Sequence, residues 1–249
     1  MWDYVKYKLF SKSEVPQRKK ISTLPIASCR HYCGFIYGAR SFNPYENYVI
    51  GVHNNVAWSD LRSQFEDFIK YYRPRNFGDV LGIDISKNIP LWVFPWNAYE
   101  KVNIHNGWLS DLDDVPDIIT HFCEQGVKRT RINEEYFWLE RAYKSIASIG
   151  YQPRLHGYIE VLELRVGEDS AYIVTDGNHR LSALAAMDRT SVVVKILPSR
   201  IDSRNVDTWF QVKRGLYSKE DAIMTLRAYI EGVKTFCRSQ TPAKIIENQ

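Results

Sequence analysis

The spacing of hydrophobic residues changes from helical to extended and back between positions 133 and 197. The segment NEEYFWLERAYKSIASIGY (133–151) has a helical period, and its apolar face consists of Tyr136, Leu139, Tyr143 and Ile146. We expect Asn133 to cap the start of this helix, because its side chain can accept a hydrogen bond from a free amide. Gly150 is the expected end of the helix.

Extended segments follow this helix. GYIEVLELRV (157–166) is apolar on both faces at its start and on one face at its end, which predicts a strand covered on both sides only at its start. GEDS (167–170) predicts a turn, AYIVT (171–175) the returning strand, and the β-branched TSVVVKIL (190–197) a third strand. Residues 176–180, called the elbow below, lead from AYIVT into a second helical pattern. The order of these elements predicts an α/β (α+β) fold.

Three further segments have recognisable patterns. SDLRSQFEDFIKYY (59–72) predicts a helix capped by Ser59, and PLWVFPWN (90–97) predicts a strand or an extended rim. A last helix follows Ser218, with an apolar face made of Ala222, Leu226, Tyr229, Ile230 and Val233. We therefore divide the chain into an aromatic-rich region (1–125) that is a candidate for substrate recognition, a core (126–200), and a C-terminal helical segment packed on the core (201–249).

Composition narrows the classes of protein to consider. The chain has 249 residues, 45% of them hydrophobic, and a net charge of +4, which favours anionic ligands without requiring DNA. No uncharged apolar run approaches the roughly 18 residues of a membrane span. Asp3, Lys6 and Lys8 interrupt any signal-peptide core, and the four cysteines are sparse. We therefore expect a reduced, cytoplasmic protein.

Two segments near the N-terminus each allow two interpretations. Residues 1–20 are basic and aromatic, which fits either weak contact with a membrane surface or a partner, or a solvated terminal arm. CRHYC (29–33) has the residue types of a zinc site, and only His53 and the distant Cys123 could complete four ligands. Buried free thiols are the alternative that we favour for this segment.

The elbow combines residues that suit an anion. The first amides of a helix lack intrahelical partners, and the helix dipole favours negative charge there. Gly177 permits a close backbone approach. Asn178 and His179 add donors, and Arg180 offers a planar fork for phosphate. The alternative is structural: Asp176 and Asn178 cap the helix, and Arg180 pairs with Asp176. The elbow by itself leaves both interpretations open.

Two motifs in this part of the chain resemble those of the ParB/sulfiredoxin superfamily. TDGNHRLSAL (175–184) resembles its signature, in which glycine, a variable residue, His or Arg, and then Arg precede a helix of small residues. RTRINEEYFWLERAYKSIASIGYQP (129–153) is similar to its first box, and the matching positions are Arg131, Ser145, Ile146 and Gly150. The resemblance covers residues 127–197. It implies a ParB/sulfiredoxin-like core with an aromatic-rich N-terminal extension and a C-terminal helix.

The residues of the elbow distinguish three branches of this superfamily. Sulfiredoxins have a catalytic cysteine where this chain has Asn178, so their reaction is nearly excluded. Partition proteins bind CTP and DNA, and typically have Glu-Arg-Arg where this chain has Asn-His-Arg. Small-molecule kinases of the free-serine type have Asp-Gly-His-His-Arg, which is the most similar, and a glutamate that matches Glu135 or the adjacent Glu134. VDTWFQVKRGLYSKEDAIMTLRAYIEG (206–232) has a looser likeness to uncharacterised proteins found with bacterial surface-polysaccharide enzymes.

The resemblance implies a kinase that uses ATP or ADP with Mg²⁺ and phosphorylates a hydroxyl of a serine-like molecule or of a sugar or glycan. The implied nucleotide-binding residues are Asp176, Gly177, Asn178, His179, Arg180 and Arg129. The implied catalytic residues are Glu135, which accepts the proton of the hydroxyl, and Arg131, which adds charge at the transferred group. Asp176 is also the candidate Mg²⁺ ligand, and His156 is a candidate substrate contact.

The rival class is a non-catalytic, nucleotide-gated regulator that binds DNA or a partner. The basic pair Lys213-Arg214 and residues 1–20 give this class some support. We expect no sequence-specific duplex binding at physiological salt, because the net charge is small and no groove-reading helix is recognisable. The sequence leaves open which nucleotide and which acceptor are used.

Overall fold

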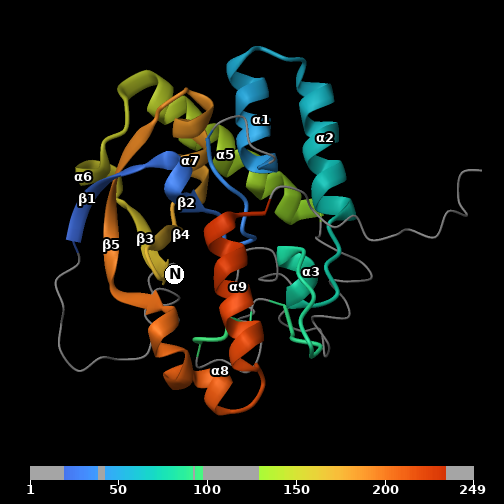
Figure 1. Ribbon diagram of the computed structural model, residues 1–249. Coiled ribbons are helices and arrows are strands. Elements are labelled where there is room, and N and C mark those ends of the chain that lie inside the picture. The colour runs from blue at the N-terminus through green and yellow to red at the C-terminus, as the bar shows by residue number, and fades with distance from the viewer. Residues whose placement is uncertain (1–19, 39–42, 92, 98–128, 234–249) are drawn as a thin grey trace, which may run out of the picture.

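A five-stranded mixed sheet forms the centre of the protein (Figure 1). The structure, a computed structural model, describes residues 20–38, 43–91, 93–97 and 129–233. The strands are β1 (Lys20–Pro25), β2 (Cys29–Arg30), β3 (Ile159–Val166), β4 (Asp169–Asp176) and β5 (Ser191–Asp202), in the order β1-β5-β3-β4-β2. The pairs β1–β5 and β3–β4 are antiparallel, and β3–β5 and β2–β4 are parallel. This arrangement confirms the predicted α/β (α+β) class.

Helices pack on the sheet and on one another. They are α1 (Pro44–His53), α2 (Trp58–Tyr71), α3 (Phe77–Leu81), α5 (Arg129–Ile149), α6 (Pro153–His156), α7 (Asn178–Ala186), α8 (Phe210–Lys213) and α9 (Lys219–Glu231), with short 3-10 turns η2 (Ile26–Ser28) and η4 (Ser203–Thr208). Helix α7 packs against α1, α5 and β3, whereas α9 packs against β3 and β4. Figure 1 shows α1 and α2 side by side at the top of the molecule.

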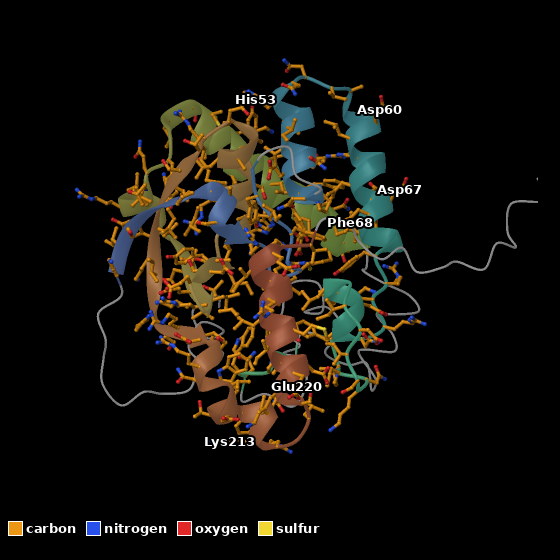
Figure 2. All side chains as sticks on the ribbon, in the orientation of Figure 1. His53, Asp60, Asp67, Phe68, Lys213 and Glu220 are labelled. Carbon is orange, nitrogen blue, oxygen red and sulfur yellow. The ribbon has the colours of Figure 1, made fainter. Side chains whose placement is uncertain are left out.

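The amphipathic patterns read from the sequence match the observed burial. The four apolar residues that recur at helical spacing in α2 (Leu61, Phe65, Phe68 and Ile69) are all buried. Figure 2 shows Phe68 on the inner side of this helix and Asp60 and Asp67 on its outer side. Strand β3 is buried on both faces over its first four residues and on one face afterwards, as predicted. Ser218 caps α9 by accepting a hydrogen bond from the amide of Asp221 at 3.0 Å.

Strand β5 continues five residues beyond the predicted end, through Pro198. Proline lacks an amide donor, so it is tolerated where a strand has no neighbour on one side. Among the described residues, which begin at Lys20, pairing with β1 ends at Ile196, and only β3 accompanies the rest of the strand. The extension is therefore a consequence of sheet topology that the local pattern did not contain.

Three local predictions were wrong. Asn133 does not cap α5 but lies inside it, because the helix already includes Arg129. Helix α2 begins at Trp58, with Ala57 rather than Ser59 at the N-cap position. The strand alternative for segment 90–97 was also wrong, because Leu91, Pro95 and Trp96 lie in turns and the other described residues have no regular secondary structure.

The turns of segment 90–97 are explained by the partners of its backbone. The carbonyl of Val93 accepts a hydrogen bond from the hydroxyl of Tyr217 at 2.7 Å, and that of Asn97 accepts one from the side chain of Gln211 at 2.9 Å. Buried backbone groups need partners, and here side chains from α8 and the turn after it satisfy them, so no neighbouring strand is required.

The first part of the chain contributes directly to the central sheet. Strands β1 and β2 come from the region assigned to residues 1–125, yet they form both edges of the sheet. Arg30 at the end of β2 is buried, and it donates hydrogen bonds to the carbonyls of Tyr229 at 2.9 Å and Ile230 at 2.6 Å in α9. The three predicted segments of the chain are therefore joined through shared hydrogen bonds in the described residues.

Some sequence predictions fall on residues outside the described ranges. The basic aromatic segment, apart from Lys20, and the thiols Cys123 and Cys237 are among them. Cys29 and Cys33 are described, and both are buried free thiols, as the favoured interpretation of CRHYC predicted. Within the described ranges, no helix has the length and hydropathy needed to cross a bilayer.

Candidate functional site

The contact between α5 and α7 joins the two sequence motifs. Nε2 of His179 in the elbow lies 2.8 Å from Oε2 of Glu135 on α5. The side chain of Glu135 is only 5% exposed, because the position shares a helical face with Ile132, Tyr136 and Leu139. Glu134 points outward instead, with 52% of its side chain exposed. Of the two candidate glutamates, Glu135 is therefore the one that contacts the elbow.

Arg131 completes an ionic cluster with these carboxylates. It lies one turn before Glu135, and its guanidinium pairs with Glu135 at 3.2 Å and with Glu134 at 2.6 Å. Burial acts to raise the pKa of Glu135, but the charges and hydrogen bonds of His179 and Arg131 together hold that pKa below its ordinary value. Glu135 is thus a buried carboxylate that is kept ionised by two partners.

The elbow turns sharply at Gly177. This residue has φ of 94°, a conformation that favours glycine, and it occupies the N-cap position of α7 without any side-chain hydrogen bond to the first amides. The structural alternative placed Asp176 and Asn178 as caps, but Gly177 stands at the N-cap position and Asn178 is the first residue of the helix. Asn178 instead uses its side-chain oxygen to accept a hydrogen bond from the hydroxyl of Tyr37 at 2.7 Å. The first amides of α7 are left for other acceptors.

Arg180 folds back over the elbow. Its guanidinium donates to the carbonyl of Gly157 and, at 3.2 Å, to that of His156, and lies 3.3 Å from the carboxylate of Asp176. A Cβ added at Gly177 would lie 2.9 Å from this guanidinium, so glycine is also needed to make room for Arg180. The pairing of Arg180 with Asp176 confirms one part of the structural interpretation of the elbow. The side chain of Arg180 remains 21% exposed.

Two of the predicted site residues lie apart from the ionic cluster. Arg129 is exposed, and its guanidinium pairs with Glu66 on α2. The side chain of His156 is exposed, and its backbone carbonyl is the part that contacts Arg180. The structure therefore brings together Glu135, Arg131 and His179 on one side of the elbow, and Asp176, Gly177 and Arg180 on the other.

A cluster of aromatic residues from the N-terminal region also contacts the elbow. His31 is buried, and its ring lies 4.7 Å from that of Tyr45, which in turn lies 6.3 Å from the ring of His179. Burial first, and the nearby His179 second, lower the pKa of His31 well below its ordinary value of 6.5. His31 therefore stays neutral, and it accepts a hydrogen bond at Nδ1 from the amide of Cys33 at 3.2 Å.

Sequence analysis missed His31, Tyr37 and Tyr45 as neighbours of the elbow. The CRHYC segment contains a histidine between two cysteines, and neither the metal site nor the buried thiols that it suggested placed His31 beside the elbow. His53, the candidate additional zinc ligand, is labelled on α1 in Figure 2 and instead contacts the hydroxyl of Tyr143 at 3.0 Å. No cluster of three or more metal-ligating side chains of the His, Cys, Asp or Glu type occurs in the described part of the chain.

A second ion pair lies beside the start of the elbow. Glu160, the exception to the apolar pattern of β3, is buried and pairs with Lys195 of β5 at 3.2 Å. Glu160 is the cross-strand partner of Asp176 in the β3–β4 ladder. The apolar pattern is thus broken where the sheet carries charge next to the elbow, and a buried carboxylate requires such a partner.

Comparison with family models, with curated proteins and with solved structures finds no match to this chain. The ParB/sulfiredoxin assignment accordingly stays a proposal, and so does every role that it implies.

Proposed function

We propose that this protein is a nucleotide-dependent phosphotransferase with a ParB/sulfiredoxin-like core, which transfers phosphate from ATP or ADP to a hydroxyl. The observation that carries this proposal is the hydrogen bond between Glu135 and His179, which are 44 residues apart in sequence. The resemblance implies a glutamate of the first box next to the elbow, and the observed contact supports that pairing.

The first amides of α7 and the guanidinium of Arg180 form the phosphate-binding part of the site. The N-cap residue Gly177 offers these amides no side-chain acceptor, and Arg180 lies beside them at the turn. Backbone amides at a helix start and a guanidinium are both suited to phosphate oxygens. Arg180 would exchange its hydrogen bonds with the carbonyls of Gly157 and His156 for bonds to phosphate.

Asp176 fits the role of a Mg²⁺ ligand by the chemistry of its side chain. Its carboxylate is 22% exposed and lies at the elbow, and Mg²⁺ bound to a nucleotide typically takes one or two protein carboxylates together with phosphate oxygens and water. The cation would neutralise charge on the phosphates. Arg131, with its positive charge beside Glu135, would act on the transferred group from the other side.

The Glu135–His179 pair accepts the proton of the attacking hydroxyl in this scheme. A buried, ionised carboxylate in contact with an imidazole forms a proton-accepting unit next to the phosphate-binding amides. The acceptor is a serine-like molecule or a sugar or glycan hydroxyl, and the looser likeness of residues 206–232 favours a sugar in surface-polysaccharide synthesis.

Binding of nucleotides tests the first half of this proposal. Calorimetric titration with ATP, ADP, CTP and GTP, each with Mg²⁺, should identify one nucleotide that binds the folded protein. Arg180→Ala should weaken that binding by roughly 10- to 100-fold, because a charged hydrogen bond contributes about 1.5–3 kcal/mol. The matched control is Arg189→Ala, an exposed arginine in the turn after α7, which should leave the affinity unchanged.

Transfer of radiolabelled phosphate to a panel of L-serine and monosaccharides tests the second half. Labelled product should form with at least one acceptor, and only with the nucleotide that binds. Nucleotide binding without any transfer, combined with steeply salt-dependent binding of DNA, would instead favour the nucleotide-gated regulator.

A further inference from the structure

We propose that Nδ1 of His179 is the atom that takes the proton from the acceptor hydroxyl, and that Glu135 is a positioning residue that orients His179. This inference rests on the proposed phosphotransferase function and assigns the proton-accepting step to a single atom. It changes the role implied for Glu135 by the sequence resemblance, in which the carboxylate itself contacts the hydroxyl.

The surroundings of Glu135 make it a poor direct partner for a substrate. Its two oxygens are engaged by His179 at 2.8 Å and by Arg131 at 3.2 Å, and the side chain is 5% exposed. A general base must come within hydrogen-bond distance of the proton that it removes, roughly 2.6–3.2 Å. A hydroxyl could reach this carboxylate only by displacing one of the two partners. The lowered pKa of Glu135 also makes the carboxylate a weaker proton acceptor.

The same contacts prepare His179 for the task. A carboxylate accepts hydrogen bonds, so Nε2 of His179 must carry a proton to make this bond. In the neutral imidazole the other nitrogen, Nδ1, then has a free lone pair. Among the described residues His179 has no hydrogen-bond partner other than Glu135. Its side chain is 25% exposed, five times the fraction of Glu135, so a substrate can approach it.

The neighbourhood of His179 contains a counter-charge for the imidazolium that would form during transfer. When Nδ1 takes a proton, the imidazolium gains a direct ion pair with Glu135. His31, the nearby second histidine, is neutral because burial and His179 lower its pKa, so it adds no opposing charge. Arg131 is the positive group in the cluster, and its charge is shared between Glu134 and Glu135.

The proposed step balances as follows. The O–H bond of the acceptor breaks and its proton moves to Nδ1 of His179, while the oxygen forms a bond to the terminal phosphorus of the nucleotide. The bond from that phosphorus to the bridging oxygen breaks, and its electron pair stays on the departing nucleotide. His179 later releases the proton to solvent, and Glu135 remains ionised throughout.

The first test measures the tautomer of His179 in the intact protein. Labelling the six histidines with ¹⁵N and assigning His179 by comparison with His179→Gln gives its ring-nitrogen shifts. The measurement is made at a pH high enough for the ring to be neutral, and the expected result is a proton on Nε2 and a bare Nδ1. A proton on Nδ1 would overturn the proposal, whatever the activity of the protein.

The second test uses rescue by free imidazole, with water as the phosphate acceptor and the best-binding nucleotide as donor. His179→Ala should lower phosphate release by roughly 100-fold or more. Imidazole in the buffer should raise the rate of phosphate release by His179→Ala at least tenfold. It should not raise the rate of Arg180→Ala. The control is His53→Ala, an exposed histidine on α1, which should leave phosphate release unchanged.

Four outcomes separate this inference from the proposed function. Normal nucleotide affinity with lost, imidazole-rescued turnover supports both. If His179→Ala loses as much nucleotide affinity as turnover, His179 is a phosphate ligand and not the general base. The proposed function would then remain intact. Acid-labile phosphate on His179 of the wild-type protein would overturn its assignment as the general base, because Nδ1 would then be a nucleophile. If no nucleotide binds the wild-type protein, the proposed function fails, and the tautomer measurement still decides whether Nδ1 is bare.

Discussion

Replacing Glu135 by glutamine should destabilise the protein far more than the same change at Glu134. Glu135 is 5% exposed and joined to both His179 and Arg131, whereas Glu134 is 52% exposed and, among the described residues, pairs with Arg131 only. Glutamine still accepts one hydrogen bond from His179, but it loses the charge that pairs with Arg131, whose side chain is 11% exposed. Loss of one charge-assisted hydrogen bond costs about 1.5–3 kcal/mol, and breaking a buried pair costs about 3–5 kcal/mol.

We therefore expect Glu135→Gln to lower the free energy of unfolding by about 2–4 kcal/mol at pH 7. Glu134→Gln, which removes an exposed ion pair, should cost about 0–1 kcal/mol. Urea unfolding followed by circular dichroism and by tryptophan fluorescence measures both variants against the wild type. Equal losses of stability in the two variants would show that Glu135 is not held in the buried cluster, and would remove the basis of its positioning role.

The same pair of variants predicts a dependence on pH. The pKa of Glu135 is lower in the folded than in the unfolded protein, so its stabilising contribution is complete above the ordinary value of 4.5. That contribution is lost as the pH falls below 4.5 and through the folded-state pKa, because both states then carry the protonated acid. The difference in unfolding free energy between wild type and Glu135→Gln should therefore shrink in this acidic range. A difference that grows on acidification would contradict the lowered pKa.

Three further predictions follow from local geometry. Gly177→Ala should lower the free energy of unfolding by about 2–4 kcal/mol, because an added Cβ meets side-chain atoms at 2.9 Å and φ is positive. The control Gly167→Ala also has a positive φ but open space around it, so it should lower that free energy by about 1 kcal/mol in the same thermal unfolding measurement. Burial raises the pKa of Cys29 to about 12, so thiol reagents at pH 8 should label it only after unfolding in urea, as peptide mass spectrometry would show. Arg30→Met should cost about 2–5 kcal/mol of unfolding free energy in urea, since it leaves carbonyls of α9 without donors; Arg75→Met, at an exposed ion pair, should change it by less than about 1 kcal/mol.

The tests of nucleotide binding and of the His179 tautomer are independent of these stability measurements. A variant that unfolds is recognised by its urea curve before any loss of binding or turnover is interpreted. Arg180→Ala needs this check in particular, because Arg180 also holds the carbonyls of Gly157 and His156 in the native structure.

Much of the local structure was determined by the sequence alone. The apolar faces of α2, α5 and α9, the two-sided burial of β3 and the turn at Gly177 are consequences of side-chain spacing and backbone preference within a few residues. The separation of Arg131 and Glu135 by one helical turn also follows from spacing alone. The same reasoning failed at Asn133 and at 90–97, where the helix extends further upstream and where distant side chains satisfy the backbone.

Only the tertiary structure decided which residues meet at the elbow. Tyr37 and Asn178 are 141 residues apart, Arg30 and Tyr229 are 199 apart, and each pair is joined by one hydrogen bond. Periodicity reports which side of an element is buried, but not which other element covers it. That choice depends on how β1 and β2 join a sheet whose other strands come more than 120 residues later, and on how α1 and α5 then pack against α7. The sequence therefore indicated Glu135 and His179 as candidates, whereas burial of the carboxylate and partial exposure of the imidazole, which assign them different roles, arise from packing between distant segments.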